Sequence, residues 1–190
     1  MSRQFWTECL TWATSDGTSV SNTVTESVIY PNVTIPGNFM QDGRCLRLTA
    51  IGKYGTASAT PGVNFIWSVR WGGVSGTLIC KSGALVTPTT TALSNGLWDV
   101  TVMLQTRSNG SSGTLMGNGW VHLHDTTAQT MRSATNVGAF GPLSNGGQAT
   151  PAAATVDLTA DTALSFTITE SAASASNTVT GLNYTIEALN

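Results

Sequence analysis

The chain has 190 residues and a formal net charge of −2, and only 9% of its residues are charged, against ~25% in an average soluble protein. Its 41% hydrophobic content and six tryptophans exclude a disordered chain and favour one folded domain. The arginines are scattered, and no apolar run approaches the ~20 residues of a membrane span. We therefore expect neither a nucleic-acid partner nor a membrane-embedded protein.

The N-terminal segment predicts a strand-like arm. It has no apolar core and no small-residue cleavage site, so it does not have the pattern of a signal peptide. Large apolar side chains occupy both faces of the alternating pattern, which predicts packing on both sides or against a neighbouring subunit. We divide the chain into an arm at residues 1–19 and a single domain at residues 20–190. The arm residues expected to make contacts are Phe5, Trp6, Leu10 and Trp12.

Alternation of apolar and polar residues predicts strands throughout the domain. In the most hydrophobic stretch, every second residue from Val63 to Trp71 is apolar. The closing stretch, residues 162–190, predicts a hairpin of two strands joined by a small polar loop. The connections at residues 84–96 and 126–154 lack periodicity and predict long loops. The predicted strands are residues 20–30, 44–54, 63–72, 76–81, 97–107, 114–124, 162–171 and 178–189.

These elements predict an all-β fold. Eight antiparallel strands with uneven loops favour an eight-stranded antiparallel jelly-roll β-sandwich, with a short N-terminal strand or arm, over an immunoglobulin-like sandwich. Threonine is the commonest residue, so we expect a solvent face of hydroxyls and amides, partly buried in an assembly. Cys9, Cys45 and Cys80 are far apart and are predicted to be free, buried thiols in a protein folded in a reducing cytoplasm.

Several stretches of the chain resemble jelly-roll virion proteins of tailed bacteriophages, of the head-decoration, head-fibre or minor-structural kind. The stretches are TESVIYPNVTIPGNFMQDGRCLRLTAIGKYG, TPGVNFIWSVRWGG, LWDVTVMLQTRSNGSSGTLMGNGWV and VDLTADTALSFTITESAASASNTVTGLNYTIEALN. The resemblance covers most of residues 20–190 and involves no catalytic signature. It implies a trimeric or otherwise oligomeric β-sandwich that is displayed on a particle and assembled in the bacterial cytoplasm.

We therefore expect a virion structural protein, in particular a homotrimeric capsid decoration (cement) protein that contacts itself and the major capsid protein on the outer head surface. One alternative is a glycan-binding adhesin of a head or tail fibre, which would use exposed aromatic side chains. A third is the major coat protein of a jelly-roll virus, but such coats usually carry a basic arm and Arg3 is alone here. Besides the arm, Trp120 and Phe140 are predicted contact residues.

The sequence predicts no enzyme, no cofactor and no metal. Its few acidic residues are dispersed, and no serine-nucleophile or phosphate-loop motif occurs. The sharpest local feature is His122-Leu123-His124, because residues two apart in a strand share a face and can bind one metal ion. No cysteine or glutamate lies nearby in the sequence to complete a ligand set. We therefore interpret the pair as solvent-face histidines beside Trp120.

Overall fold

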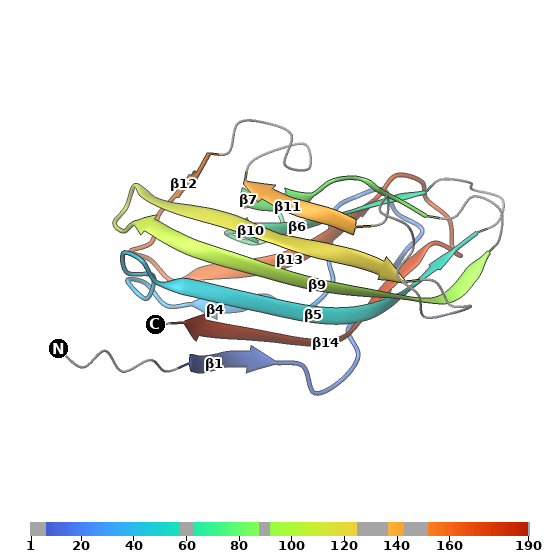
Figure 1. Ribbon diagram of the computed structural model, residues 1–190, viewed down its shortest axis with the longest axis horizontal. Helices are drawn as coiled ribbons and strands as arrows, with labels where there is room; N and C mark the ends of the chain where they lie inside the picture. The colour runs from blue at the N-terminus through green and yellow to red at the C-terminus, as the bar shows by residue number, and fades with distance from the viewer. Residues whose placement is uncertain (1–6, 58–62, 88–91, 125–136, 143–151, 190) are drawn as a thin grey trace.

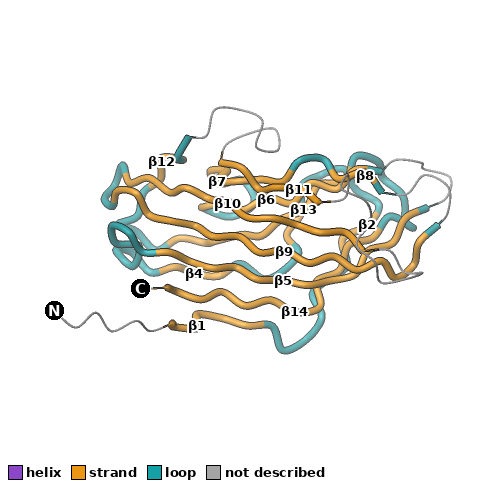
Figure 2. Tube along the Cα trace, in the orientation of Figure 1, coloured by secondary structure: helices purple, strands orange, loops and turns teal. Residues whose placement is uncertain are grey.

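The protein is a β-sandwich of antiparallel strands in two packed layers, as its computed structural model shows (Figures 1 and 2). The structure describes residues 7–57, 63–87, 92–124, 137–142 and 152–189, and within these ranges there is no helix. The described residues therefore contain no helix with the length and apolar character needed to traverse a bilayer. The predicted all-β sandwich is confirmed.

The first layer consists, in order, of β1 (Thr7–Trp12), β14 (Thr178–Leu189), β5 (Cys45–Thr56), β9 (Leu93–Ser108) and β10 (Gly113–His124). Figure 1 looks onto this layer. The second layer lies behind it and consists of β7 (Thr77–Ser82), β6 (Asn64–Trp71) and β13 (Thr162–Glu170), with β3 (Ser27–Val28) and β4 (Val33–Ile35) both paired to β13.

Four short strands complete the pairing. β11 (Val137–Pro142) pairs with β10 on one side and β7 on the other, so it joins the two layers at one edge. β2 (Val20–Ser21) pairs with β14, β8 (Leu85–Val86) with β6, and β12 (Ala154–Val156) with β10. The pairing therefore runs unbroken from β1 through β11 to β3.

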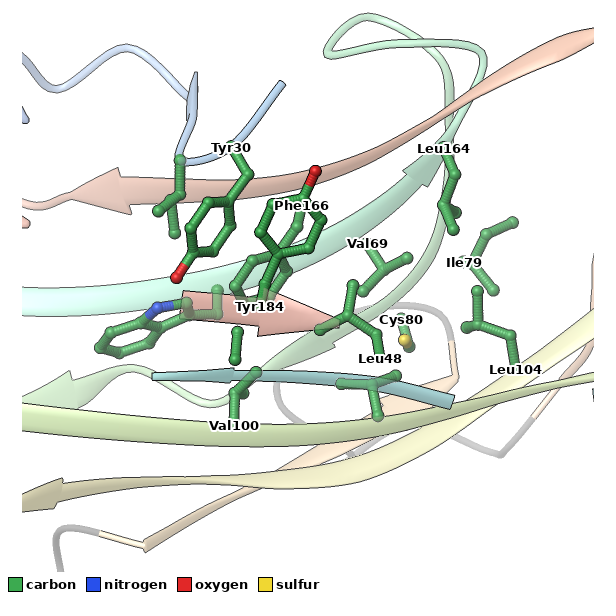
Figure 3. Close-up of a cluster of buried hydrophobic side chains, with 14 of the residues drawn as sticks. Tyr30, Leu48, Val69, Ile79, Cys80, Val100, Leu104, Leu164, Phe166 and Tyr184 are labelled. Carbon is green, nitrogen blue, oxygen red and sulfur yellow. The ribbon is translucent and has the colours of Figure 1, made fainter. Parts of the chain in front are cut away.

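The core lies between the layers and follows the period-two pattern of the long strands. The predicted inward residues of β5, β6, β9 and β10 are all buried, including Trp67 and Trp98, whose rings lie 5.8 Å apart. Figure 3 shows how side chains from both layers meet there. Residues labelled in that view are Tyr30, Leu48, Val69, Ile79, Cys80, Val100, Leu104, Leu164, Phe166 and Tyr184.

The predicted closing hairpin is wrong. β13 pairs with β6, β3 and β4, whereas β14 pairs with β1, β2 and β5, so the two strands lie in opposite layers. In this arrangement the large inward apolar residues of the two strands face each other across the core, where Leu164, Phe166, Tyr184 and Ile186 lie together. The residues between them form a crossover, in which Ser171 N–H bonds to Asn64 O at 3.0 Å and Asn22 N–H bonds to Ser174 O at 3.1 Å.

The predicted strand at residues 20–30 is also wrong, because this segment crosses between layers instead of following one. It contributes β2 to the first layer and β3 to the second. The chain turns at Asn22, whose φ is 54°. Glu26 lies on the second layer, where Arg70 Nε and Nη2 donate to its carboxylate at 2.6 and 2.7 Å.

Two predicted loops contain strands. Residues 84–96 include β8 and the beginning of β9, which starts at Leu93 rather than 97. Residues 126–154 include β11, whose backbone pairs with two strands although its sequence, VGAFGP, has little alternation. Pairing on both sides fixes a strand by backbone hydrogen bonds alone, which a search for amphipathic periodicity does not detect.

Two expectations about burial need correction. Alternation over residues 162–171 predicts that Ser165 and Thr167 face solvent, but both are buried. The 26–32 segment covers that face, and Ser165 Oγ donates to Asn32 Oδ1 at 2.7 Å. The three cysteines are free, but only Cys80 is buried, while Cys45 is half-buried and Cys9 is exposed. Burial raises the pKa of the Cys80 and Cys45 thiols.

Candidate functional site: the outer face of the first layer

The side of the first layer that faces away from the core, here called the outer face, gathers most of the features that sequence analysis singled out. Ladder partners in a sheet point to the same side, so the register places the two exposed tryptophans in one row. Three threonines, one from each intervening strand, separate them. The row is Trp12, Thr185, Thr49, Thr101 and Trp120.

The outer face exposes large apolar side chains. Trp12 is 60% and Trp120 48% exposed, and Ile51 and Leu97 are 47% and 41% exposed in the neighbouring rows. Four strand spacings separate the two tryptophans across the sheet, roughly 19 Å at the usual ~4.8 Å between strands. Exposed apolar residues that cluster on one face, rather than being scattered singly, mark a contact surface.

Charge on the outer face is sparse and partly compensated. Arg47 Nη2 lies 2.7 Å from Glu187 Oε2, and these residues are ladder partners on β5 and β14. Such a partly exposed pair contributes little stability. It does remove one charge of each sign from the face, on which Lys53, Arg107 and the Asp99 cluster also lie.

Asp99, His122 and His124 form one cluster on this face. Asp99 on β9 is the ladder partner of His122 on β10, and His124 lies two residues further along the same strand. His122 Nδ1 is 2.9 Å from Asp99 Oδ2, and His124 Nε2 is 2.6 Å from Asp99 Oδ1. The carboxylate therefore accepts one hydrogen bond from each ring, and the two imidazole rings lie 6.3 Å apart.

A hollow of about 310 Å³ opens beside the cluster. Its lining includes Asp99, His124 and three apolar side chains, Ile51, Leu97 and Leu182. Leu182 reaches this place because β14 carries a bulge: the register shifts between Gly181 and Asn183. Plain alternation over residues 178–189 predicts that Leu182 points inward with Tyr184. The bulge explains why that prediction is wrong, since one extra residue reverses the side to which a side chain points.

The bulge is held from inside by Tyr30. Its hydroxyl lies 2.8 Å from both Ile51 O and Asn183 O. A Cβ at Gly181 would lie 2.2 Å from the Tyr30 ring, so glycine is required at that position. Burial raises the pKa of the Tyr30 hydroxyl, which keeps it a donor to these two carbonyls.

The predicted contact residues have different positions in the structure. Trp12 and Trp120 lie on the outer face and are exposed. Leu10 lies at a register shift in β1, between Cys9 and Thr11, and packs against the core. Phe5 and Trp6 lie outside the described residues. Phe140 belongs to β11, and its side chain also lies outside the described part of the structure.

Local alternation places the two histidines on one face but does not predict Asp99. The signal lies in the SNGSSG turn between the strands predicted at 97–107 and 114–124, because counting back from this turn places Asp99 opposite His122. A ligand search restricted to neighbours in sequence does not detect a residue that lies directly across a hairpin.

Comparisons with known proteins gave no match to a family model, to a curated protein or to a solved structure. The chemistry of the outer face and the strand order are therefore the features of the molecule that bear on its function.

Proposed function

We propose that this chain is a non-enzymatic structural protein of a tailed-phage virion. In this proposal it is a capsid decoration protein, assembled in the bacterial cytoplasm, that binds the outer head surface as a homotrimer. The observation that carries the proposal is the outer face itself, with exposed Trp12, Ile51, Leu97 and Trp120 in a field of threonine hydroxyls. A face of this kind, with few uncompensated charges, suits burial against a protein surface.

The strand order supports a jelly-roll topology as part of this proposal. β1, β14, β5 and β9 are neighbours in one layer, and β4, β13, β6 and β7 follow in the other. The chain changes layer from β2 to β3, from β4 to β5, from β5 to β6, from β8 to β9, from β12 to β13 and from β13 to β14. Two sheets of four main strands each, connected by repeated crossing, fit the eight strands and two Greek keys of a jelly roll. In this arrangement β10, β11 and β12 are an addition at one edge.

The proposed mechanism is mechanical and does not require chemistry. Burying exposed apolar area gains ~25 cal/mol per Å², and a stable interface needs about 1,000 Å² or more. The tryptophans are suited to anchor such an interface, because buried aromatic side chains commonly dominate binding energy. Repeated over a shell, this contact would hold neighbouring capsomers together.

The proposal is tested by measuring oligomeric state and head binding with the same protein. We expect light scattering to give a trimer and sedimentation to show the protein bound to phage heads assembled without it. Trp12→Ala and Trp120→Ala should each weaken head binding or trimer formation at least tenfold. Val24→Ala is the matched control, because Val24 is 55% exposed and outside the outer face.

Heads assembled with the protein should also survive heating better than heads without it. A stable monomer that has no affinity for heads, or equal survival of both kinds of head, would contradict the decoration role.

A second candidate function is glycan binding by a head or tail fibre, favoured by the spacing of the two tryptophans. Exposed indole rings can stack on sugar rings, and the threonines between them offer hydroxyl groups for hydrogen bonds. A glycan array probed with the wild type, Trp12→Ala and Trp120→Ala separates the two functions. Glycan binding that both substitutions abolish, without head binding, would favour the adhesin.

A further inference from the structure

We infer that Asp99, His122 and His124 form a binding site for one zinc ion. Two imidazole nitrogens and one carboxylate oxygen supply three ligands, and a water molecule supplies the fourth. The inference rests on this cluster alone, so it stands or fails independently of the proposed virion role.

The chemistry of the ligands selects the metal. Imidazole and carboxylate are ordinary zinc ligands, with bonds of ~2.0–2.2 Å in tetrahedral geometry. Calcium and magnesium favour sets made of oxygen atoms, so a site with two imidazoles disfavours them. The three residues therefore suit a borderline-soft divalent ion.

The geometry of the cluster matches one ion. The ligand atoms of the three residues all lie within 4.8 Å of one another. Ligands on a tetrahedral zinc ion stand roughly 3.4 Å apart, as follows from the usual bond lengths. The Asp99–His124 and Asp99–His122 contacts, 2.6 and 2.9 Å, are shorter than this. Small side-chain rotations that open both hydrogen bonds would admit the ion.

The backbone supports the site on a fixed frame. Asp99 and His122 are directly opposite each other in the continuous β9–β10 ladder, and His124 pairs with Leu97 in the same ladder. The Tyr54 hydroxyl donates to His124 O at 3.1 Å, which ties the end of β10 to β5. Ligands carried by paired strands are held more accurately than ligands on loops.

The cluster is accessible to solvent. The side chains of His122 and His124 are each 22% exposed, and that of Asp99 is 34% exposed. A site with three protein ligands keeps one coordination position open. Because Asp99 and His124 also line the hollow beside Ile51 and Leu97, that position adjoins an apolar surface. The ion would also offset the carboxylate charge on the outer face.

The test is a titration of the full chain, stripped with chelator, with Zn²⁺ alone. Calorimetry should show one ion bound per chain, and Zn²⁺ should raise the melting temperature. Co²⁺ should give the visible spectrum of a tetrahedral ion with nitrogen and oxygen ligands. The zinc affinity should fall more than ~100-fold in each of Asp99→Asn, His122→Gln and His124→Gln. Even the loss of a residue that only hydrogen-bonds to a metal ligand lowers metal affinity 10–100-fold.

Two controls separate this site from other metal-binding groups. Cys9→Ser with Cys45→Ser removes the two thiols that are not buried and should leave zinc affinity unchanged. Glu8→Gln removes an exposed carboxylate outside the cluster and should also have no effect. Each variant is checked for an unchanged circular dichroism spectrum.

Failure to bind Zn²⁺ at 100-fold molar excess would overturn the inference. Equal affinity in the wild type and in folded Asp99→Asn would do the same. A loss of binding in the cysteine double variant alone would assign the ion to the thiols and likewise reject the site.

Discussion

Glu170 is a carboxyl group whose ionisation opposes the fold. Its side chain is 1% exposed on the inward side of β13, opposite Phe65 in the ladder. Neither carboxylate oxygen has a hydrogen-bond partner. Burial therefore raises the pKa of Glu170 from 4.5 to about 7, because the charged form loses its hydration without gaining a partner.

This raised pKa makes a prediction about stability and pH. Between pH 4.5 and 7 the folded chain keeps a proton on Glu170 that the unfolded chain releases, so the free energy of unfolding falls as pH rises through this window. Glu170→Gln should remove this loss. The free energy of unfolding of the variant, minus that of the wild type, should therefore be about 1–3 kcal/mol higher at pH 8 than at pH 4.5. Denaturant unfolding of both proteins at several pH values measures this difference. Parallel curves for wild type and variant would contradict the prediction, and Glu8→Gln is the control.

Glu26 shows the opposite behaviour, because it has partners. Burial alone would raise the pKa of its carboxyl group, but hydrogen bonds from Arg70 and Thr167 outweigh burial and lower it. Arg70 also donates from Nη1 to Gly76 O at 2.9 Å. The pair is about one-fifth exposed, so it is less costly to break than a fully buried ion pair.

Arg70→Met should lower the free energy of unfolding by about 2–3 kcal/mol at pH 7. A lowered folded pKa gives stability that is present above pH 4.5 and is lost as pH falls through the folded pKa. The cost should therefore shrink in acid. Urea unfolding of Arg70→Met, Glu26→Gln and the double variant measures the coupling. A cost that is equal at pH 3 and pH 7 would show that the guanidinium acts through packing alone.

At the scale of elements, the bulge in β14 changes which residues of one strand point inward. Val179 points inward before the bulge and Tyr184 points inward after it. The odd-numbered and even-numbered positions therefore exchange sides at Leu182. Tyr30 fixes this exchange by contacting a carbonyl on each of the two strands, β5 and β14.

Tyr30→Phe should lower the free energy of unfolding by about 1–2 kcal/mol, because two buried carbonyls lose a shared donor. Tyr184→Phe is the matched control: its ring lies against Tyr30 with centroids 4.3 Å apart and planes tilted by 33°, and its hydroxyl makes no hydrogen bond to the residues that the structure describes. Thermal and denaturant unfolding compare the two variants. An equal loss in both would assign the effect to ring packing rather than to the bulge.

How much of each element the sequence predicts depends on what stabilises it. Strands with one apolar face, such as β5, β6 and β10, are predicted nearly to their bounds, because burial of that face stabilises them. β4, β8 and β11 are missed, since they are short and are held by backbone pairing with neighbouring strands. The face shared by His122 and His124 follows from local alternation. The position of Asp99 beside them depends on the register between β9 and β10. The alternation of β10 alone does not contain that information.

At the scale of the whole molecule, assignment of strands to layers is the part least visible in sequence. β13 and β14 are adjacent in the chain and alternate like a hairpin, yet they face each other across the core. Local periodicity states which side of a strand is buried, but not which strand lies beside it. The outer face follows from that assignment: only when β1, β14, β5, β9 and β10 lie together do Trp12 and Trp120 share one row.

The pairing of β1 with β14 has a mechanical consequence. Thr7 pairs with Leu189, so both ends of the described chain emerge at the same end of the sandwich, as Figure 1 shows. A force that pulled these ends apart would load the ladder one rung at a time, starting at Thr7, and β1 would peel away while the remaining strands kept their pairing. Tension along the length of the other strands would instead load many backbone hydrogen bonds together. The force needed to unfold the molecule should therefore be low when it is pulled by its termini. It should be high when the tension runs along the other strands.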